Sequence, residues 1–68
     1  MNTKLLFNCM WYEEITPEML AMELNLTQEQ FYEKAFGEAG FTLEERLVIR
    51  GLLKLSDGEM ERIFGEEA

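Results

Sequence analysis

Apolar residues recur along most of the chain at spacings of three and four, which is the period of a helix that buries one face. Leu20 and Leu24 share one such face, and Phe31 and Ala35 share another. No stretch alternates apolar and polar residues with the period of a half-buried strand. The pattern predicts an all-α fold with five short helices, at about residues 3–13, 17–24, 28–36, 43–54 and 57–64.

Residues that begin and end helices stand at the ends of these segments. A hydroxyl residue followed three positions later by Glu or Gln predicts a capping box, and this spacing occurs at Thr27/Gln30, Thr42/Glu45 and Ser56/Glu59. Gly37 and Gly65 stand where left-handed C-terminal caps are expected. Asn25 also tolerates the left-handed conformation, so it can close a helix with a sharp turn.

The segment from 17 to 36 predicts a helix-turn-helix corner. Its joining turn, Asn25-Leu26-Thr27, is too short for the flanking helices to run antiparallel, and Ala21 is small enough to let their backbones approach. Helical spacing predicts that the following residues are buried together: Leu20, Ala21, Leu24, Leu26, Phe31, Ala35, Ile49, Leu53, Ile63 and Phe64. In the first helix, Leu5, Leu6, Cys9 and Met10 can face this core.

A chain of 68 residues makes one domain, 1–68, near the lower size limit for folding without disulfides or metals. Its longest apolar runs have four residues, too few to span a bilayer, and we expect no signal peptide. The single cysteine, Cys9, has no internal disulfide partner and no histidine with which to share a zinc ion. We therefore expect a cytoplasmic protein in which Cys9 is a small buried apolar residue.

Fourteen acidic residues against six basic ones give a net charge of −8. This charge opposes attraction to nucleic acid or to anionic lipid and suits a basic partner. The chain has no histidine, no paired nucleophile, no glycine-rich phosphate loop and no cluster of metal ligands. We therefore expect no catalysis, no cofactor, no small-molecule substrate and no membrane association.

Two stretches, TPEMLAMELNLTQEQFYEKAFG and FTLEERLVIRGLLKLSDGEMERIF, together resemble the small Cro/repressor-like helix-turn-helix proteins of phages and prophages, often called the XRE family. In the first stretch the family's apolar positions hold Leu20, Leu24, Leu26, Phe31 and Ala35, and its small position holds Ala21. The resemblance implies a compact five-helix domain whose third helix enters the major groove of DNA. It also implies a transcriptional regulator that binds operator DNA as a dimer.

Carried onto this sequence, the base-reading positions implied by the resemblance are Gln28, Glu29, Gln30 and Glu33, and Lys34 lies beside them as a further DNA-binding residue. Glutamine can form a bidentate pair with adenine, which suits the two glutamines. Glu29 and Glu33 would repel phosphates unless cations compensate. The alternative roles are helix capping and solvation for the glutamines, and solvation for the lysine.

Other residues predict contact surfaces outside this helix. Phe7 and Trp11 lie four residues apart and project away from the expected core, which predicts a protein–protein contact, with a homodimer as the simplest case. The alternative is that a small core recruits both rings. Leu43 and Leu47 form a further apolar pair that is expected at an interface.

Arg46, Arg50 and Lys54 share one stripe of the fourth helix at spacings of four. This stripe is either a cationic contact surface or a solvated face paired with carboxylates from elsewhere.

These observations leave two alternative functions for the protein. The sequence narrowly favours a phage-type regulator that binds operator DNA as a dimer. The alternative is an acidic helix-turn-helix domain that has lost DNA affinity and serves as a protein-interaction module, or as a DNA mimic, toward a basic partner. The charge of −8 favours this alternative.

Overall fold

The computed structural model describes residues 1–65, which form five α-helices and no strand. These are α1 (Thr3–Tyr12), α2 (Pro17–Glu23), α3 (Gln28–Phe36), α4 (Leu43–Leu53) and α5 (Asp57–Phe64). The all-α prediction is confirmed, and every predicted helix end lies within one residue of the observed one. Within the described range, no helix is both long enough and apolar enough to cross a membrane.

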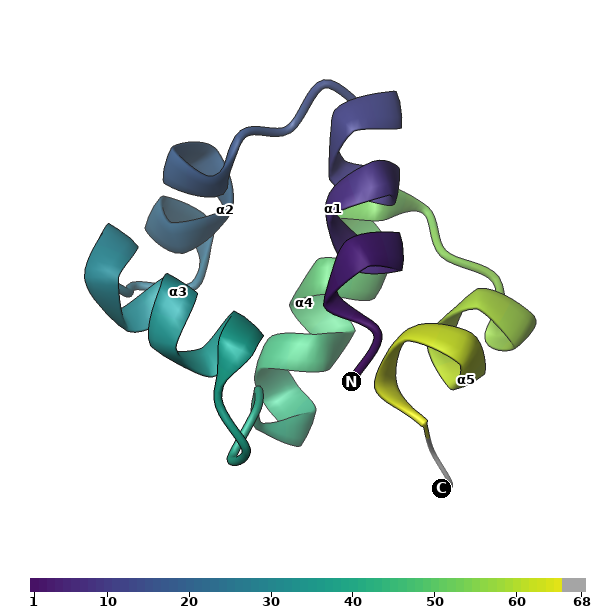
Figure 1. Ribbon diagram of the computed structural model, residues 1–68. Helices are drawn as coiled ribbons and strands as arrows, with labels where there is room; N and C mark the ends of the chain where they lie inside the picture. The colour runs from purple at the N-terminus through teal and green to yellow at the C-terminus, as the bar shows by residue number, and fades with distance from the viewer. Residues whose placement is uncertain (66–68) are drawn as a thin grey trace.

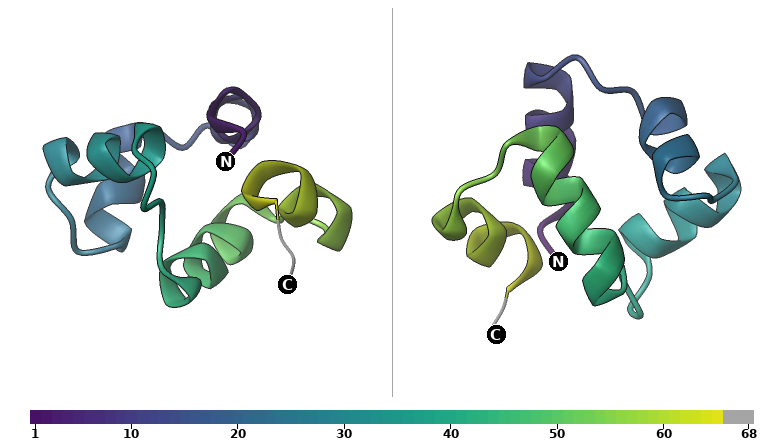
Figure 2. Two further views of the ribbon diagram at one scale, coloured as in Figure 1. Left: turned by 60° about the horizontal axis from the view of Figure 1, so that its bottom comes forward. Right: turned by 180° about the vertical axis from the view of Figure 1, so that it is seen from behind.

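The helices pack into a body of 27 × 25 × 20 Å. The pair α2–α3 forms one side and α5 lies on the other, with α4 between them (Figure 1). Seen from behind, α4 passes in front of α1, so α4 lies on the outside of the molecule (Figure 2). The Asn2 N–H donates a hydrogen bond to the Ile63 carbonyl (2.6 Å), which joins the start of the chain to α5.

The helix ends largely follow the predicted caps. All three capping boxes are present, with the Thr27, Thr42 and Ser56 hydroxyls each accepting a backbone N–H at 3.0–3.1 Å. Asn25 closes α2 in the left-handed region (φ 59°), and Gly65 does the same for α5 (φ 64°). These predictions are confirmed.

The predicted left-handed cap at Gly37 is wrong. Gly37 ends α3 in an extended conformation (φ −92°, ψ 176°). The residue is nevertheless suited to glycine, because a Cβ there would collide with the Glu33 carbonyl oxygen. The glycine therefore permits a close backbone approach rather than a left-handed turn.

The core contains most of the residues that helical spacing predicted. Leu20, Ala21, Leu24, Phe31, Ala35, Ile49, Leu53 and Ile63 are buried, together with Leu6 and Met10 of α1. Leu26 and Phe64 are only half-buried, and they pack against the edge of the core with Leu5 and Cys9. Two further buried side chains, Phe41 and Leu55, were not predicted, and both lie in connections between helices.

The short connection between α2 and α3 holds these two helices against each other. The Leu26 N–H donates to the Ala21 carbonyl (2.9 Å), so the chain turns back directly onto α2. Ala21 is buried, which allows the close approach that its small side chain predicted. The third helix is further fixed to α1 by the Thr3 hydroxyl, which donates to the Ala35 carbonyl (2.5 Å).

Replacing Phe31 with alanine should lower the unfolding free energy by about 3–5 kcal/mol, because it leaves a cavity where a fully buried ring packs. Urea denaturation measures the change. The matched control is Phe36→Ala in the same helix, whose side chain is exposed and whose loss should cost much less. Equal losses from both variants would contradict the assignment of Phe31 to the centre of the core.

Candidate functional site

The exposed face of α3 is acidic at its centre. Phe31 and Ala35 are buried against the rest of the domain, and the helical period therefore turns Glu29 and Glu33 to the opposite side. Both glutamates are exposed. A ligand that approaches the outward face of α3 meets these two carboxylates first.

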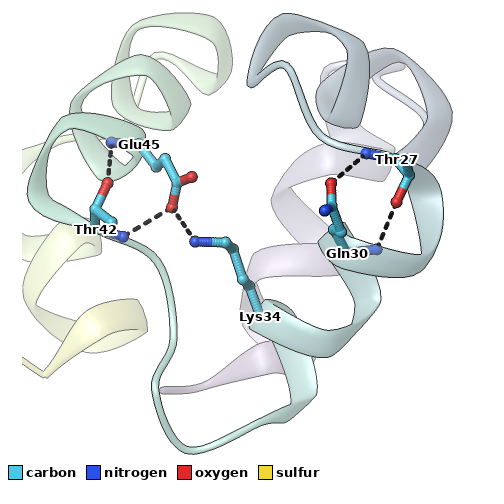
Figure 3. Close-up of polar contacts among 5 residues, drawn as sticks. All are labelled: Thr27, Gln30, Lys34, Thr42 and Glu45. Atoms are coloured by element: carbon cyan, nitrogen blue, oxygen red, sulfur yellow. Dashed lines mark hydrogen bonds and ion pairs between the residues drawn. The ribbon is translucent and has the colours of Figure 1, made fainter.

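The two glutamines of α3 are in different situations. Gln28 is exposed in the first turn, and its side chain has no hydrogen bond within residues 1–65. The side-chain oxygen of Gln30 accepts the Thr27 N–H at 3.0 Å, which completes the capping box (Figure 3). That oxygen is the atom that would accept from adenine in a bidentate pair. Gln30 therefore has the capping role that was the alternative to base recognition.

Lys34 points from α3 toward α4 and not outward. Its Nζ lies 3.0 Å from Oε1 of Glu45 (Figure 3). Both side chains are partly buried, at 28% and 17% exposure. Glu45 also accepts the Thr42 N–H at 2.8 Å, so one carboxylate serves both the capping box and the ion pair. The positive charge of Lys34 is balanced within the domain.

The environment of Glu45 lowers the pKa of its carboxyl group. Burial by itself raises this pKa, but the hydrogen bond from Thr42 and the charge of Lys34 more than offset it. The ionised carboxylate is therefore the form that the folded state favours.

Tyr32 and Phe36 of α3 lie beside its acidic face, and Phe7 and Trp11 of α1 extend this aromatic group away from it. Tyr32 and Phe36 lie one helical turn apart on α3, with stacked rings at 6.2 Å. Phe7 of α1 reaches both rings, at 6.4 Å from Tyr32 and 5.7 Å from Phe36. Trp11, one turn after Phe7, is 83% exposed. We call Phe7, Trp11, Tyr32 and Phe36 the aromatic surface.

The two residues of the predicted Phe7/Trp11 pair lie in different environments. Phe7 is half-buried and also touches the core, with its ring 6.1 Å from that of Phe31. Trp11 projects into solvent. Both side chains line one apolar groove of about 570 Å³. Met10, Ile15 and Pro17 also line this groove, as does the acidic residue Glu14.

The other predicted contact residues lie on α4. Leu43 and Leu47 are both exposed, as an interface pair requires. The cationic stripe of this helix is mostly engaged within the domain: Arg46 lies over the Phe64 ring (5.8 Å), and Arg50 pairs with Asp57 (2.6 Å).

Charge is distributed unevenly along the chain and hence over the fold. Residues 13–45, which include α2 and α3, contain nine glutamates and one lysine. Their net charge of −8 equals that of the whole chain. Lys34 is the single lysine of this segment and is paired with Glu45, so the segment itself supplies no further cation to offset its acidic groups.

Cys9 is half-buried near the junction of α1 and α5. Burial raises the pKa of its thiol, and the carboxylates of Glu59 and Glu13 add to this effect against the opposing charge of Arg62. The thiol is therefore protonated at neutral pH and is a poor nucleophile. Across residues 1–65, no three His, Cys, Asp or Glu side chains are grouped so that they could hold a metal ion.

Comparisons with protein-family models, with curated proteins and with solved structures found no match to this chain. The likeness to Cro/repressor-like proteins therefore depends on the residues quoted above.

Tyr32 and Phe36 are the site residues that the sequence analysis missed. Their spacing of four, one position after the buried pair Phe31 and Ala35, was the available signal. This spacing places Tyr32 and Phe36 on the side of α3 next to its buried stripe, and not within that stripe.

A double-mutant cycle should detect the ion pair between Lys34 and Glu45. Lys34→Met keeps the aliphatic part of the side chain, and Glu45→Gln keeps a capping box of the kind that Gln30 forms. We expect a coupling energy of about 1 kcal/mol at neutral pH from urea denaturation. Additive effects of the two changes would contradict an energetic role for the pair. Glu33→Gln, at an exposed position of α3, is the control and should have little effect.

The pH dependence of this stabilisation follows from the lowered pKa of Glu45. A carboxyl whose pKa is lower in the folded state stabilises the fold above its unfolded pKa, and this contribution is lost as pH falls through the folded pKa. The stability difference between wild type and Glu45→Gln should therefore be complete above roughly pH 5 and shrink below about pH 4. A difference that stays constant from pH 7 to about pH 3 would contradict the assignment.

Proposed function

We propose that this chain is a helix-turn-helix domain that binds a basic protein surface through the outward face of α3 and the adjoining aromatic surface. One observation carries the proposal: exposed Glu29 and Glu33 stand beside exposed Tyr32 and Phe36, while the only cation of α3, Lys34, is held by Glu45.

Electrostatics supports a basic partner. Residues 13–45 carry a net charge of −8, and their field repels phosphates and attracts lysine- and arginine-rich surfaces. Affinity for DNA depends on cations that displace counterions from the phosphates, and α3 presents no unpaired cation for that purpose.

The aromatic surface supports a protein as the partner. Large aromatic side chains that are exposed in the free state and flanked by charge are typical of the central anchors of protein interfaces. Trp11 and Phe36 are 83% and 67% exposed, which leaves most of their apolar area available for burial by a partner.

Operator DNA is the second candidate. Two observations favour it: α2 and α3 are joined by a short turn at Asn25, and Gln28 is exposed in the first turn of α3, where a base-reading residue is expected. In this alternative a dimer binds the operator, and the duplex must approach Glu29 and Glu33 at a cost in electrostatic energy.

Titration with a basic peptide tests the proposal. Trp11, the single tryptophan, lies in the aromatic surface, and its fluorescence reports binding there. The probe is a synthetic amphipathic peptide of lysine and leucine, and the same peptide with glutamate in place of lysine is its control. We expect the lysine peptide to change the emission of Trp11 and the glutamate peptide to leave it unchanged. Glu29→Gln with Glu33→Gln should weaken its binding by about tenfold or more, because the acidic face supplies the attraction.

The matched variant Glu44→Gln with Glu61→Gln removes the same charge from α4 and α5 and should weaken the peptide much less. Equal weakening by both double variants would show that net charge, and not the α3 face, governs binding. That result would contradict the proposed site.

Titration of a fluorescent DNA duplex at low salt tests the second candidate. We expect no binding by wild type, and binding by Glu29→Gln/Glu33→Gln if the scaffold suits DNA and only its charge excludes it. If wild type binds and Gln28→Ala relaxes the preference at one base pair by about 1–3 kcal/mol, operator DNA replaces the protein partner as the function.

A further inference from the structure

The groove beside Phe7 and Trp11 continues the aromatic surface from α3 toward the start of α2. It lies where α1 ends, at the connection that joins α1 to α2 across the top of Figure 1. Phe7, Met10 and Trp11 of α1 form one side, and Ile15 and Pro17 follow from the connection and from α2. Its volume of about 570 Å³ is in the range of pockets that receive a ligand or the apolar side chains of a partner. We call it the α1–α2 groove.

Glu14 lines the α1–α2 groove in a backbone conformation that favours glycine. Its N–H donates to the Trp11 carbonyl (3.0 Å), and the next N–H, from Ile15, donates to the Met10 carbonyl (2.8 Å). These two bonds close α1 in a Schellman motif, with Glu14 at the left-handed position (φ 61°). Glycine is the usual residue there, because a Cβ is disfavoured at positive φ. The closure of α1 therefore does not require a glutamate.

The charge of Glu14 is also unfavourable for α1. The C-terminal end of a helix carries partial negative charge and is stabilised by basic residues. Lys54, at the equivalent left-handed position after α4 (φ 56°), has this favourable charge, whereas the last turn of α1 has no basic residue. Glu14 is exposed and forms no ion pair within residues 1–65. Backbone conformation and charge thus both make Glu14 costly to the fold.

The negative charge at this groove is not offset by the neighbouring helix. The N-terminal end of α2 carries partial positive charge, but Glu18 in its first turn compensates it. Glu13, next to Glu14, adds a further carboxylate to the same connection. The α1–α2 groove therefore combines apolar walls with an acidic border.

This combination specifies the chemistry of the occupant. A purely apolar group would cover Glu14 without a partner for its carboxylate, and an acidic group would be repelled. An apolar side chain with a cation beside it satisfies both parts of the site. Trp11, which is 83% exposed, would then lose much of its contact with water.

We infer that the α1–α2 groove binds an apolar side chain of the basic partner, while Glu14 pairs with a lysine or arginine that neighbours this side chain in the partner. The inference rests on the proposed function and adds a second contact to it. The acidic face of α3 attracts the basic surface, and the α1–α2 groove anchors it. Phe7 joins the two contacts, because it lines the groove and its ring lies 6.4 Å from that of Tyr32.

Nuclear magnetic resonance locates the peptide of lysine and leucine on the labelled protein. We expect amide shifts at Glu14 and Ile15 in addition to those on α3, and nuclear Overhauser contacts between the peptide's leucine methyls and the Ile15 side chain. Shifts confined to α3 would overturn the inference and leave the proposed function standing. Absence of any shift would overturn both.

Substitutions of Glu14 separate its cost to the fold from its role in binding. Glu14→Gly should raise the urea midpoint of unfolding, because glycine suits the left-handed position and removes an anion from the helix end. The same variant should weaken the peptide about fivefold, as loss of one ion pair does. Glu14→Gln, which keeps a side chain at positive φ, should weaken the peptide to the same extent.

Two matched variants are the controls, with the Trp11 fluorescence titration as the measurement. Glu23→Gln removes the same charge from the other end of α2 and should weaken the peptide much less. Lys54→Gly changes the same backbone position after α4 and should not weaken it. The inference is overturned if Glu14→Gln and Glu23→Gln weaken the peptide equally, or if Glu14→Gly binds it as tightly as wild type.

Discussion

The ring of Phe31 is fully buried and packs near aromatic rings from two other parts of the chain, Phe7 at 6.1 Å and Phe41 at 5.6 Å. In a domain with so little interior, one such ring supplies a large share of the apolar area removed from water. Phe31 must therefore face inward, and the helical period then turns Glu29 and Glu33 outward. The charge presented by α3 is thus a consequence of how its buried side packs.

Features whose determinants lie close together in sequence could be predicted well. The Thr27–Gln30 box needs only two side chains and two backbone groups within one helical turn, and the structure contains it as expected. Asn25 closes α2 because its local conformational preference is sufficient for that turn. At Gly37 the local sequence was not sufficient for the prediction. Glycine suits both a left-handed cap and a close contact between backbone atoms, and the sequence does not distinguish the two.

Features that depend on contacts between separate elements could not be predicted. Phe41 is buried in a connection, where the helical period that identifies inward positions no longer applies. Lys34 and Glu45 meet across two helices, and no spacing rule links residues eleven positions apart. This contact decides the character of the site, because it turns a cation expected at the outward face of α3 toward α4.

The hydrogen bond between the Asn2 N–H and the Ile63 carbonyl also bears on how the polypeptide is made. Ile63 is fully buried, and α1 packs against α5, so the two ends of the described chain pack together. During synthesis, α2 and α3 can associate early because their contacts are local, whereas the contact between α1 and α5 forms only after α5 leaves the ribosome. A nascent chain that stalls before Ile63 lacks the packing of α5 against α1, and its incomplete core makes it a substrate for chaperones and proteases until translation resumes.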